Sequence, residues 1–164
     1  MSPLPDSAGA MPDWRALQAA VRPGMVIVAE SGDRPLGQIM LDGRHALHAD
    51  EPAAAGGRDT GPSPYELLLM GLGACTSMTL RLYAGRKQWP LEGVSVRLRH
   101  DNVHAADCAD CETREGMLDR INREIELIGT LDAGQRARLL EIAGKCPVHR
   151  TLTSEIVIKT ALRA

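Results

Sequence analysis

The four cysteines are the residues of this sequence best suited to do chemistry, and they form two pairs. Cys75 and Cys146 lie far apart in the sequence, each within a helical pattern, whereas Cys108 and Cys111 form a C-x-x-C pair next to histidines. A cysteine thiolate is a nucleophile, a metal ligand and one half of a disulfide. Each pair is therefore a candidate site of nucleophilic, redox or metal chemistry.

The first pair brings a mid-helix cysteine together with one at a helix end. Cys75 lies among small residues, where a single cysteine is ordinarily a small buried hydrophobe. Cys146 ends a second predicted helix, because Pro147 follows it directly, and we expect it to be the more accessible thiol. His149 offers it a proton partner. If the second helix packs on the small residues of the first, the two thiols meet and can cycle between dithiol and disulfide.

The second pair belongs to a polar segment with the spacing H-x3-H-x3-C-x2-C. Its members are His100, His104, Cys108 and Cys111. Four nitrogen and sulfur ligands suit tetrahedral zinc, and the carboxylates that flank the cysteines attract a cation and disfavour a fast dithiol. A zinc site, redox chemistry and an exposed loop without a dedicated role all remain open. His100 also continues an apolar alternation and is equally explained by packing in a sheet.

Hydrophobic periodicity predicts the elements that must position these residues. After a short helix that Asp13 caps, strands are expected at 25–30, 36–41 and 44–49, a long helix from 63 to about 85, strands at 94–100 and 121–127, a helix at 132–145 and a strand at 151–161. Residues 101–115 are expected to be irregular. The order βββ-α-ββ-α-β predicts an α+β fold.

The long helix has a marked start and an unusual middle. Ser63 is a predicted N-cap, Pro64 takes the first helical position, and Glu66 completes a capping box. Gly71 and Gly73 each cost the helix about 1 kcal/mol relative to alanine. We therefore expect another segment to pack very close to this part of the helix.

Composition excludes several classes of function. The 164 residues contain 19 Lys and Arg against 21 Asp and Glu, and only 2% are aromatic, so we expect no nucleic-acid partner. No apolar run reaches the roughly 20 residues of a membrane span, and the start of the chain resembles no secretory signal. We expect a cytoplasmic protein without a membrane partner, with a flexible tail at residues 1–12 and a single domain at residues 13–164.

Two motifs carry a resemblance to a known superfamily. GPSPYELLLMGLGACTSMT around the first cysteine and IAGKCPVH around the second resemble the OsmC/Ohr superfamily of osmotically inducible and organic hydroperoxide resistance proteins. The resemblance extends from about residue 25 to residue 160. It implies an intertwined homodimer in which antiparallel sheets wrap two buried central helices. The segment with the C-x-x-C pair is outside the superfamily pattern and looks like a subfamily feature.

The resemblance also implies an activity, the reduction of organic hydroperoxides by thiols. Cys75 is the implied peroxidatic cysteine, which a hydroperoxide oxidises to a sulfenic acid. Cys146 is the implied resolving cysteine, which forms a disulfide that an external dithiol reduces. This chemistry requires no cofactor.

An arginine held by a glutamate activates the peroxidatic cysteine in the relatives. Arg34 matches that arginine in its approximate position, and Arg44 and Arg58 remain open. Glu66 lies nine residues before the cysteine, whereas the corresponding glutamate of the organic hydroperoxide members lies ten before, where this chain has Tyr65. Glu66 therefore either holds the arginine or serves only as the capping acid.

A non-catalytic module of the same fold is the competing hypothesis. In that case the chain binds a metal or a small ligand, with zinc at His100, His104, Cys108 and Cys111. Cys75 and Cys146 are then packing residues or sensors. A peroxide-consumption assay separates the two hypotheses.

Overall fold

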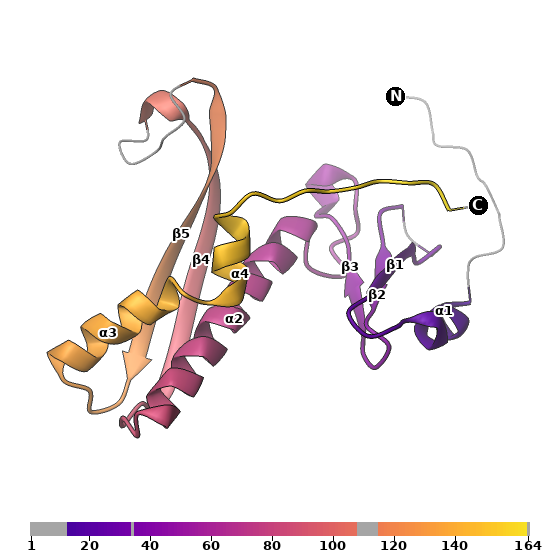
Figure 1. Ribbon diagram of the computed structural model, residues 1–164. Coiled ribbons are helices and arrows are strands. Elements are labelled where there is room, and N and C mark those ends of the chain that lie inside the picture. The colour runs from indigo at the N-terminus through magenta and orange to yellow at the C-terminus, as the bar shows by residue number, and fades with distance from the viewer. Residues whose placement is uncertain (1–12, 34, 108–114, 164) are drawn as a thin grey trace. The chain divides into compact units, whose positions relative to one another are not determined.

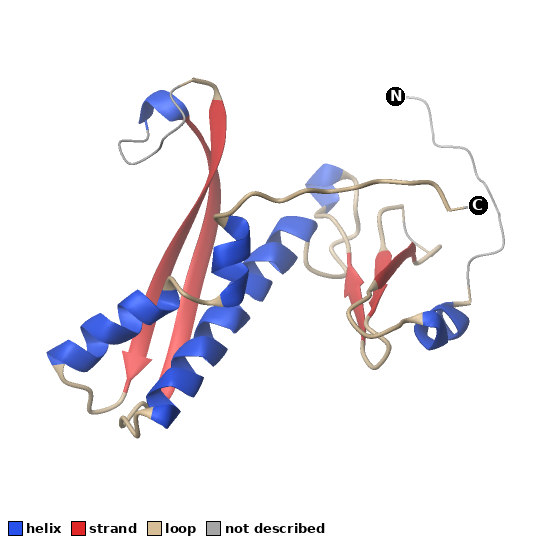
Figure 2. Cartoon of the chain, viewed as in Figure 1, coloured by secondary structure: helices blue, strands red, loops and turns tan. Residues whose placement is uncertain are grey.

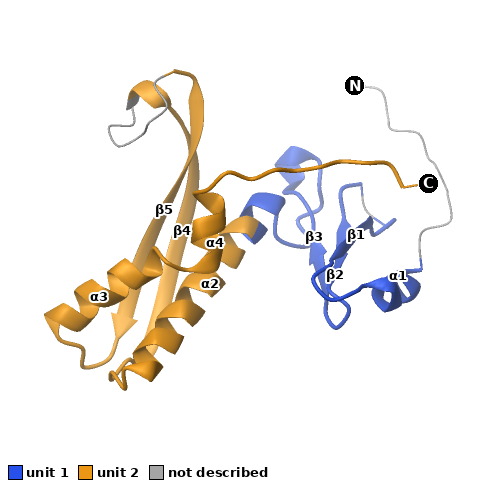
Figure 3. Ribbon diagram, viewed as in Figure 1, with its two compact units in different colours: residues 1–67 blue, residues 68–164 orange. Residues whose placement is uncertain are grey.

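The computed structural model describes residues 13–33, 35–107 and 115–163. Arg34, Cys108, Cys111 and the predicted tail at residues 1–12 lie outside the described residues. The chain divides into two compact units, residues 1–67 and residues 68–164 (Figure 3). The single domain over residues 13–164 stays a prediction, and each unit is described by itself.

The first unit consists of a short helix and a three-stranded antiparallel sheet in the order β1-β2-β3 (Figure 1). The elements are α1 (Trp14–Ala20), β1 (Ile27–Glu30), β2 (Gln38–Leu41), β3 (Ala46–Ala49) and the 3-10 helix η1 (Ala53–Ala55). Asp13 caps α1 by accepting the Arg15 N–H at 2.9 Å. The three predicted strands and the short helix are confirmed.

One buried carboxylate organises the loop that follows β3. Asp50 accepts the Thr60 hydroxyl at 2.7 Å and also the backbone N–H groups of Glu51, Arg58 and Thr60. The Thr60 hydroxyl and these N–H groups lower the pKa of Asp50, although burial opposes the shift. The composition of the loop, rich in glycine and alanine, gave no sign of this arrangement.

The second unit contains a long antiparallel hairpin and three helices (Figure 2). The elements are α2 (Pro64–Arg86), whose first turn belongs to the first unit, β4 (Gly93–His104), the 3-10 helix η2 (Ala105–Asp107), β5 (Met117–Ile128), α3 (Ala133–Ala143) and α4 (Pro147–Leu152). Pairing runs from Gly93 and Ile128 to His104 and Met117. Residues 101–104 were expected to be irregular but belong to β4, so that expectation is wrong for them. Polar side chains on an exposed hairpin do not prevent backbone pairing.

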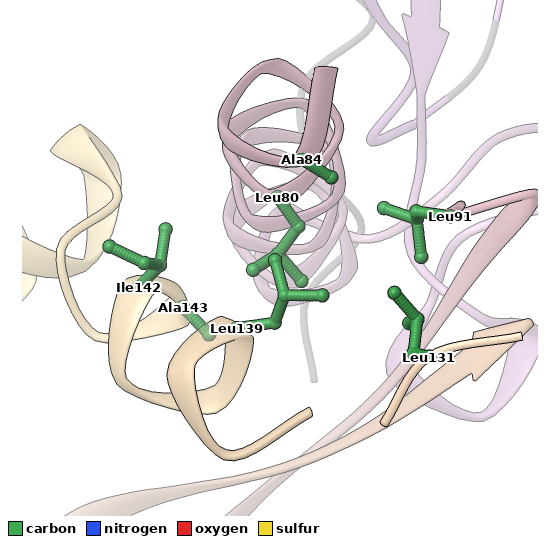
Figure 4. Close-up of a cluster of buried hydrophobic side chains, with 7 residues drawn as sticks. All are labelled: Leu80, Ala84, Leu91, Leu131, Leu139, Ile142 and Ala143. Atoms are coloured by element: carbon green, nitrogen blue, oxygen red, sulfur yellow. The ribbon is translucent and has the colours of Figure 1, made fainter. Parts of the chain in front are cut away.

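The core of this unit lies where α2 and α3 pack on the hairpin. The buried residues of α2 recur every four positions and form one face of the helix: Leu72, Thr76, Leu80 and Ala84. The core cluster contains Leu80 and Ala84 from α2, Leu139, Ile142 and Ala143 from α3, and Leu91 and Leu131 from the segments beside the strands (Figure 4). Leu80 and Leu139 point toward each other and are both fully buried.

One of the two mid-helix glycines allows a close approach. A Cβ atom on Gly73 would lie 2.9 Å from Cδ1 of Leu98, so β4 packs directly on α2 at this point. No described atom lies within 4 Å of the corresponding position on Gly71. The expectation that another segment packs close to this part of the helix is therefore confirmed at Gly73.

The predicted strand at residues 151–161 is not formed. The first residues of this predicted strand belong to helix α4, and the described residues after α4 have no regular structure. A strand requires hydrogen bonds to a neighbour, and no described strand of this chain pairs with the segment. Ile156, Val157 and Ile158 are all exposed, so their apolar pattern is not satisfied within the chain.

Helix α2 is long and apolar enough to cross a membrane. This finding corrects the expectation that no segment of the chain reaches the length and hydropathy of a membrane span. Its most apolar window has a mean hydropathy of 1.3, and 22% of that window is buried. One such helix is weak evidence for a membrane span, because the core helix of a soluble protein passes the same test. The finding shows mainly that much of the apolar surface of α2 is uncovered in the single chain.

Candidate active site

Cys146 lies at the junction of α3 and α4, where it is the N-cap of α4. Pro147 occupies the first turn of that helix, and Sγ of Cys146 accepts the His149 N–H at 3.3 Å. The thiol is fully buried, whereas Cys75 on α2 is half-buried. The expectation that Cys146 is the more accessible thiol is therefore wrong, because the core closes over the junction of the two helices.

Two further side chains complete the surroundings of Cys146. The hydroxyl of Thr76, which is also fully buried, lies 3.6 Å from Sγ of Cys146. It donates to the Leu72 carbonyl at 2.8 Å, a common arrangement for threonine in a helix. Nη1 of Arg123 donates to the same hydroxyl at 3.0 Å and to the Ala143 carbonyl at 3.2 Å. A strand, two helices and the junction between α3 and α4 thus meet at one buried thiol.

The two free thiols meet at this site. Burial, the largest influence, opposes ionisation of Cys146, but the His149 N–H, the Thr76 hydroxyl, a hydrogen bond with the Cys75 side chain and the charge of Arg123 outweigh it. Together these groups lower the pKa of Cys146 below its ordinary value. The structure therefore places Cys75 and Cys146 near each other as free thiols, with the pKa of Cys146 below its ordinary value.

Arg123 occupies an unusual place for an arginine. On β5 it shares a strand face with Ile121 and Ile125, and it is half-buried as they are. Its partner in the β4–β5 ladder is Leu98, the residue that packs against Gly73. The guanidinium therefore projects from the face of the hairpin that packs on α2, where it reaches Thr76.

A cavity of about 430 Å³ lies beside these residues. Its lining is Leu72, Asp119, Ile121, Arg123, His149, Leu152 and Thr153. Arg123 and His149 belong both to the cavity and to the surroundings of Cys146. The cavity thus combines aliphatic walls with an arginine next to the thiol pair.

The capping box at the start of α2 is confirmed. One carboxylate oxygen of Glu66 accepts the Ser63 N–H at 2.7 Å and the Ser63 hydroxyl at 2.9 Å, and the Ser63 backbone and side chain lower the pKa of Glu66. Among the described residues, no arginine pairs with Glu66. Arg44 and Arg58 lie in the first unit, which is not placed relative to Cys75, and Arg34 lies outside the described residues.

The two histidines of the predicted zinc site share one face of β4. Nε2 of His100 lies 2.9 Å from Oδ1 of Asp119, which also accepts the side chain of Asn102. His100 and His104 are four strand residues apart, a separation of roughly 13 Å along the strand. No group of three or more His, Cys, Asp or Glu that could hold a metal occurs in the described part of the chain, which excludes Cys108 and Cys111.

Sequence reasoning missed two residues of the site, Thr76 and Arg123. Thr76 was one of several small residues around Cys75. Arg123 did carry a signal, since it takes an apolar position in the alternation from Ile121 to Leu127. A charged residue at such a position either projects to the rim of the sheet or is held by buried polar partners, and here Thr76 and the Ala143 carbonyl hold it.

Comparison with known proteins places the chain in a family. The profile of the OsmC-like protein family matches residues 56–161, more than half of the chain. No curated protein gives a match. Two similar solved structures are the organic hydroperoxide resistance protein OsmC of Legionella pneumophila, at 22% identity over 80% of this chain and 91% of that one with a TM-score of 0.57, and the organic hydroperoxide resistance protein OhrB of Bacillus subtilis, at 20% identity over 79% and 90% with a TM-score of 0.55.

A third structure, the OsmC-like protein of Mycoplasma pneumoniae, is 20% identical over 78% of this chain and 85% of that one, with a TM-score of 0.57. These likenesses show a shared α+β fold. The family profile covers both Cys75 and Cys146 as well as the whole hairpin. The chain belongs to the OsmC-like protein family.

Proposed function

We propose that this protein is a thiol-dependent reductase of organic hydroperoxides, with Cys75 as the peroxidatic and Cys146 as the resolving cysteine. The observation that carries the proposal is the position of the Thr76 hydroxyl, next in sequence to Cys75, at 3.6 Å from Sγ of Cys146, which brings two free thiols close together in a chain of the OsmC-like family. Two proteins with similar structures are described as organic hydroperoxide resistance proteins, which supports the same substrate class here.

Access decides which thiol meets the peroxide. Cys75 is half-buried and Cys146 is fully buried, so a peroxide reaches Cys75 first. The Cys75 thiolate attacks the distal oxygen of the hydroperoxide, and the O–O bond breaks as the S–O bond forms. The alkoxide takes a proton and leaves as an alcohol, and Cys75 becomes a sulfenic acid. The aliphatic walls of the neighbouring cavity suit the carbon chain of such a substrate.

Resolution follows from the state of the second thiol. The Cys146 thiolate attacks the Cys75 sulfur, the S–O bond breaks, and hydroxide leaves and is protonated to water. Burial opposes ionisation of Cys146, but its hydrogen bonds and the Arg123 charge lower its pKa, which raises the fraction of the attacking thiolate. An external dithiol then reduces the disulfide, and no cofactor takes part.

Ionisation of Cys75 requires its own cation. We assign this role to Arg34, as the resemblance implies, with Arg44 and Arg58 as the alternatives, and Glu66 as the residue that holds the arginine. The capping box commits one carboxylate oxygen of Glu66, which leaves the second oxygen for such a contact. A transient disulfide of this kind fits a reducing compartment such as the cytoplasm.

We also propose that the protein is a homodimer. Met70, Met78 and Leu82 on α2 are more than half exposed in the single chain, and a second copy is the occupant that the family resemblance implies. The unpaired apolar segment at residues 156–158 gives a second surface for the same partner. Sedimentation should show a dimer at micromolar concentration, and a stable monomer would contradict this assignment.

The experiment that tests the activity measures consumption of cumene hydroperoxide with dithiothreitol or dihydrolipoamide as the reductant. We expect turnover in the parent, none in Cys75→Ser and, when the reductant is left out, consumption of one peroxide per chain by Cys146→Ser, which leaves a sulfenic acid reactive with dimedone. The double variant Cys108→Ser and Cys111→Ser is the matched control and should turn over like the parent. Consumption by the parent at the rate of Cys75→Ser would exclude the proposed function.

Zinc binding by the second cysteine pair is the alternative role. The contact between His100 and Asp119 favours it, because histidines that bind metals commonly donate their other N–H to a carboxylate. Elemental analysis of untagged protein should then show about one zinc per chain, lost in the variant Cys108→Ser and Cys111→Ser. Substoichiometric zinc in the parent would exclude this role.

A further inference from the structure

The two thiols of the candidate site differ in access and in electrostatic surroundings. Cys75 is half-buried, and Cys146 is fully buried. The backbone N–H of His149, the Thr76 hydroxyl and the Arg123 charge all act on Cys146. A disulfide between these residues would therefore have one reachable sulfur and one sulfur whose thiolate is already stabilised.

Arg123 reaches Cys146 through Thr76. The Thr76 hydroxyl has a single proton and two lone pairs, and Nη1 of Arg123 donates to it at 3.0 Å. The proton can point to the Leu72 carbonyl at 2.8 Å or to Sγ of Cys146 at 3.6 Å. A negative charge on Cys146 draws the proton toward sulfur, and the guanidinium polarises the hydroxyl that donates it.

We propose that Arg123 and Thr76 set the direction of disulfide reduction, so that an external dithiol attacks Cys75 and Cys146 leaves as the stabilised thiolate. The inference rests on the proposed function, because it requires the disulfide between the two cysteines. Arg123 and Thr76 are positioning residues in this scheme, since they act on the sulfur of Cys146 and do not exchange electrons themselves.

The exchange balances in two steps. A thiolate of the dithiol attacks Cys75 Sγ, the bond between Cys75 and Cys146 breaks, and its electron pair stays on Cys146 as a thiolate. The second thiol of the reductant is then deprotonated and attacks the first sulfur of the reductant, which is bonded to Cys75. Cys75 is released and takes up a proton. The dithiol is oxidised to a disulfide, and both cysteines are reduced.

Both factors that govern such an exchange favour the same sulfur. A disulfide is attacked at the accessible sulfur, and the better leaving group is the thiol that ionises more readily. Among the described residues, the charged and titratable groups that act on Cys146 are Arg123 from β5 and Cys75 from α2, whereas His149 from α4 contacts it through its backbone N–H. Across the cavity, Asp119 is engaged by His100 and Asn102.

The test maps the first mixed disulfide in protein that carries Cys108→Ser and Cys111→Ser. This protein is oxidised with one equivalent of cumene hydroperoxide, treated briefly with limiting glutathione, quenched in acid and analysed by peptide mass spectrometry. We expect glutathione on Cys75 in excess over Cys146 by on the order of ten-fold. An equal or reversed ratio would overturn the inference and leave the proposed function standing. Absence of the disulfide before glutathione is added would contradict the proposed function itself, and the inference with it.

Variants then test the roles of Arg123 and Thr76. Arg123→Met and Thr76→Val should lower the ratio of the two adducts several-fold, whereas Thr76→Ser, which keeps the hydroxyl, should retain it. Arg97→Met is the matched control, because Arg97 is an exposed arginine of the same hairpin and pairs with Glu126 at 3.6 Å, away from Cys146. If Arg97→Met lowers the ratio as much as Arg123→Met, the effect is one of general charge, and the inference is wrong.

A direct readout of ionisation separates positioning from folding. In reduced protein with Cys75→Ser, Cys108→Ser and Cys111→Ser, ultraviolet thiolate absorbance reports Cys146 alone. Arg123→Met and Thr76→Val should move the titration of Cys146 to higher pH. Thr76→Ser, which keeps the hydroxyl, should titrate like the parent. A titration that neither variant moves, in protein with unchanged circular dichroism, would overturn the inference.

Discussion

The two regions that the sequence marks as chemical behave in opposite ways. Around Cys146, residues far apart in the sequence converge, because α2, β5 and the junction of α3 and α4 pack together. Along β4, His100 and His104 are close in the sequence but about 13 Å apart, because a strand extends by about 3.3 Å per residue. Spacing along the chain is therefore a good guide to a site only when the element that carries it is known.

The two regions also differ in how strongly electrostatics can act. Cys146 and Thr76 are fully buried, so their hydrogen bonds and the Arg123 charge act with little competition from water. Asp119 is 62% exposed beside a half-buried His100. Solvent screens that pair, so we expect changes there to have small effects.

The largest effect should come from the core beneath the thiol site. Leu139 on α3 is fully buried against Leu80, and truncation to alanine leaves a cavity. We expect Leu139→Ala to lower the free energy of unfolding by about 2–5 kcal/mol in chemical denaturation. The matched control is the next residue, Leu140, which is 66% exposed, and Leu140→Ala should change it by less than about 0.5 kcal/mol. Equal effects would mean that α3 does not pack as described.

A pair of glycine variants tests how closely the hairpin approaches α2 next to the site. Gly71→Ala meets no described atom and should raise the free energy of unfolding by up to about 1 kcal/mol, through helix propensity alone. Gly73→Ala gains the same propensity but pushes the end of the Leu98 side chain, so its net gain should be smaller or negative. Thermal unfolding of both variants measures the difference, and an equal gain in the two would contradict the close contact.

Much of the fold could be predicted from the sequence, because its signals are local. The N-cap at Asp13 and the capping box at Ser63 and Glu66 are set by neighbouring residues, and both were predicted correctly. The strand expected at residues 151–161 failed because pairing depends on a partner that the local pattern does not specify. The site was half predicted: both thiols were found by type and motif, but Thr76 and Arg123 matter only through contacts 47 residues apart in the chain.

The buried site and the hairpin should differ in how their contributions to the free energy of unfolding depend on pH. Cys146 represents the buried site. Although burial opposes it, the hydrogen bonds and the Arg123 charge lower the pKa of Cys146 in the folded state. The thiolate therefore adds stability that is full above the unfolded value of about 8.5 and is lost as the pH falls through the lower folded pKa. Under reducing conditions, the destabilisation by Cys146→Ser should grow between neutral pH and about pH 9. A difference that is constant with pH would contradict the stabilised thiolate.

The smallest effect should come from Asp119 on the hairpin. The hydrogen bond with His100, followed by that with Asn102, lowers the pKa of Asp119, so its folded pKa lies below the unfolded value of about 3.9. The contribution of Asp119 is therefore present above about pH 4 and is lost as the pH falls through the folded pKa. Asp119→Asn should destabilise the protein slightly at neutral pH and not at all in strong acid, as measured by urea unfolding across that range. His100→Ala removes the partner of Asp119 and should have an equally small effect. His48→Ala, which removes an exposed imidazole in the first unit, is its control. If Asp119→Asn costs as much at neutral pH as the substitutions around Cys146, the hairpin pair is not screened by solvent, and the contrast between the two regions fails.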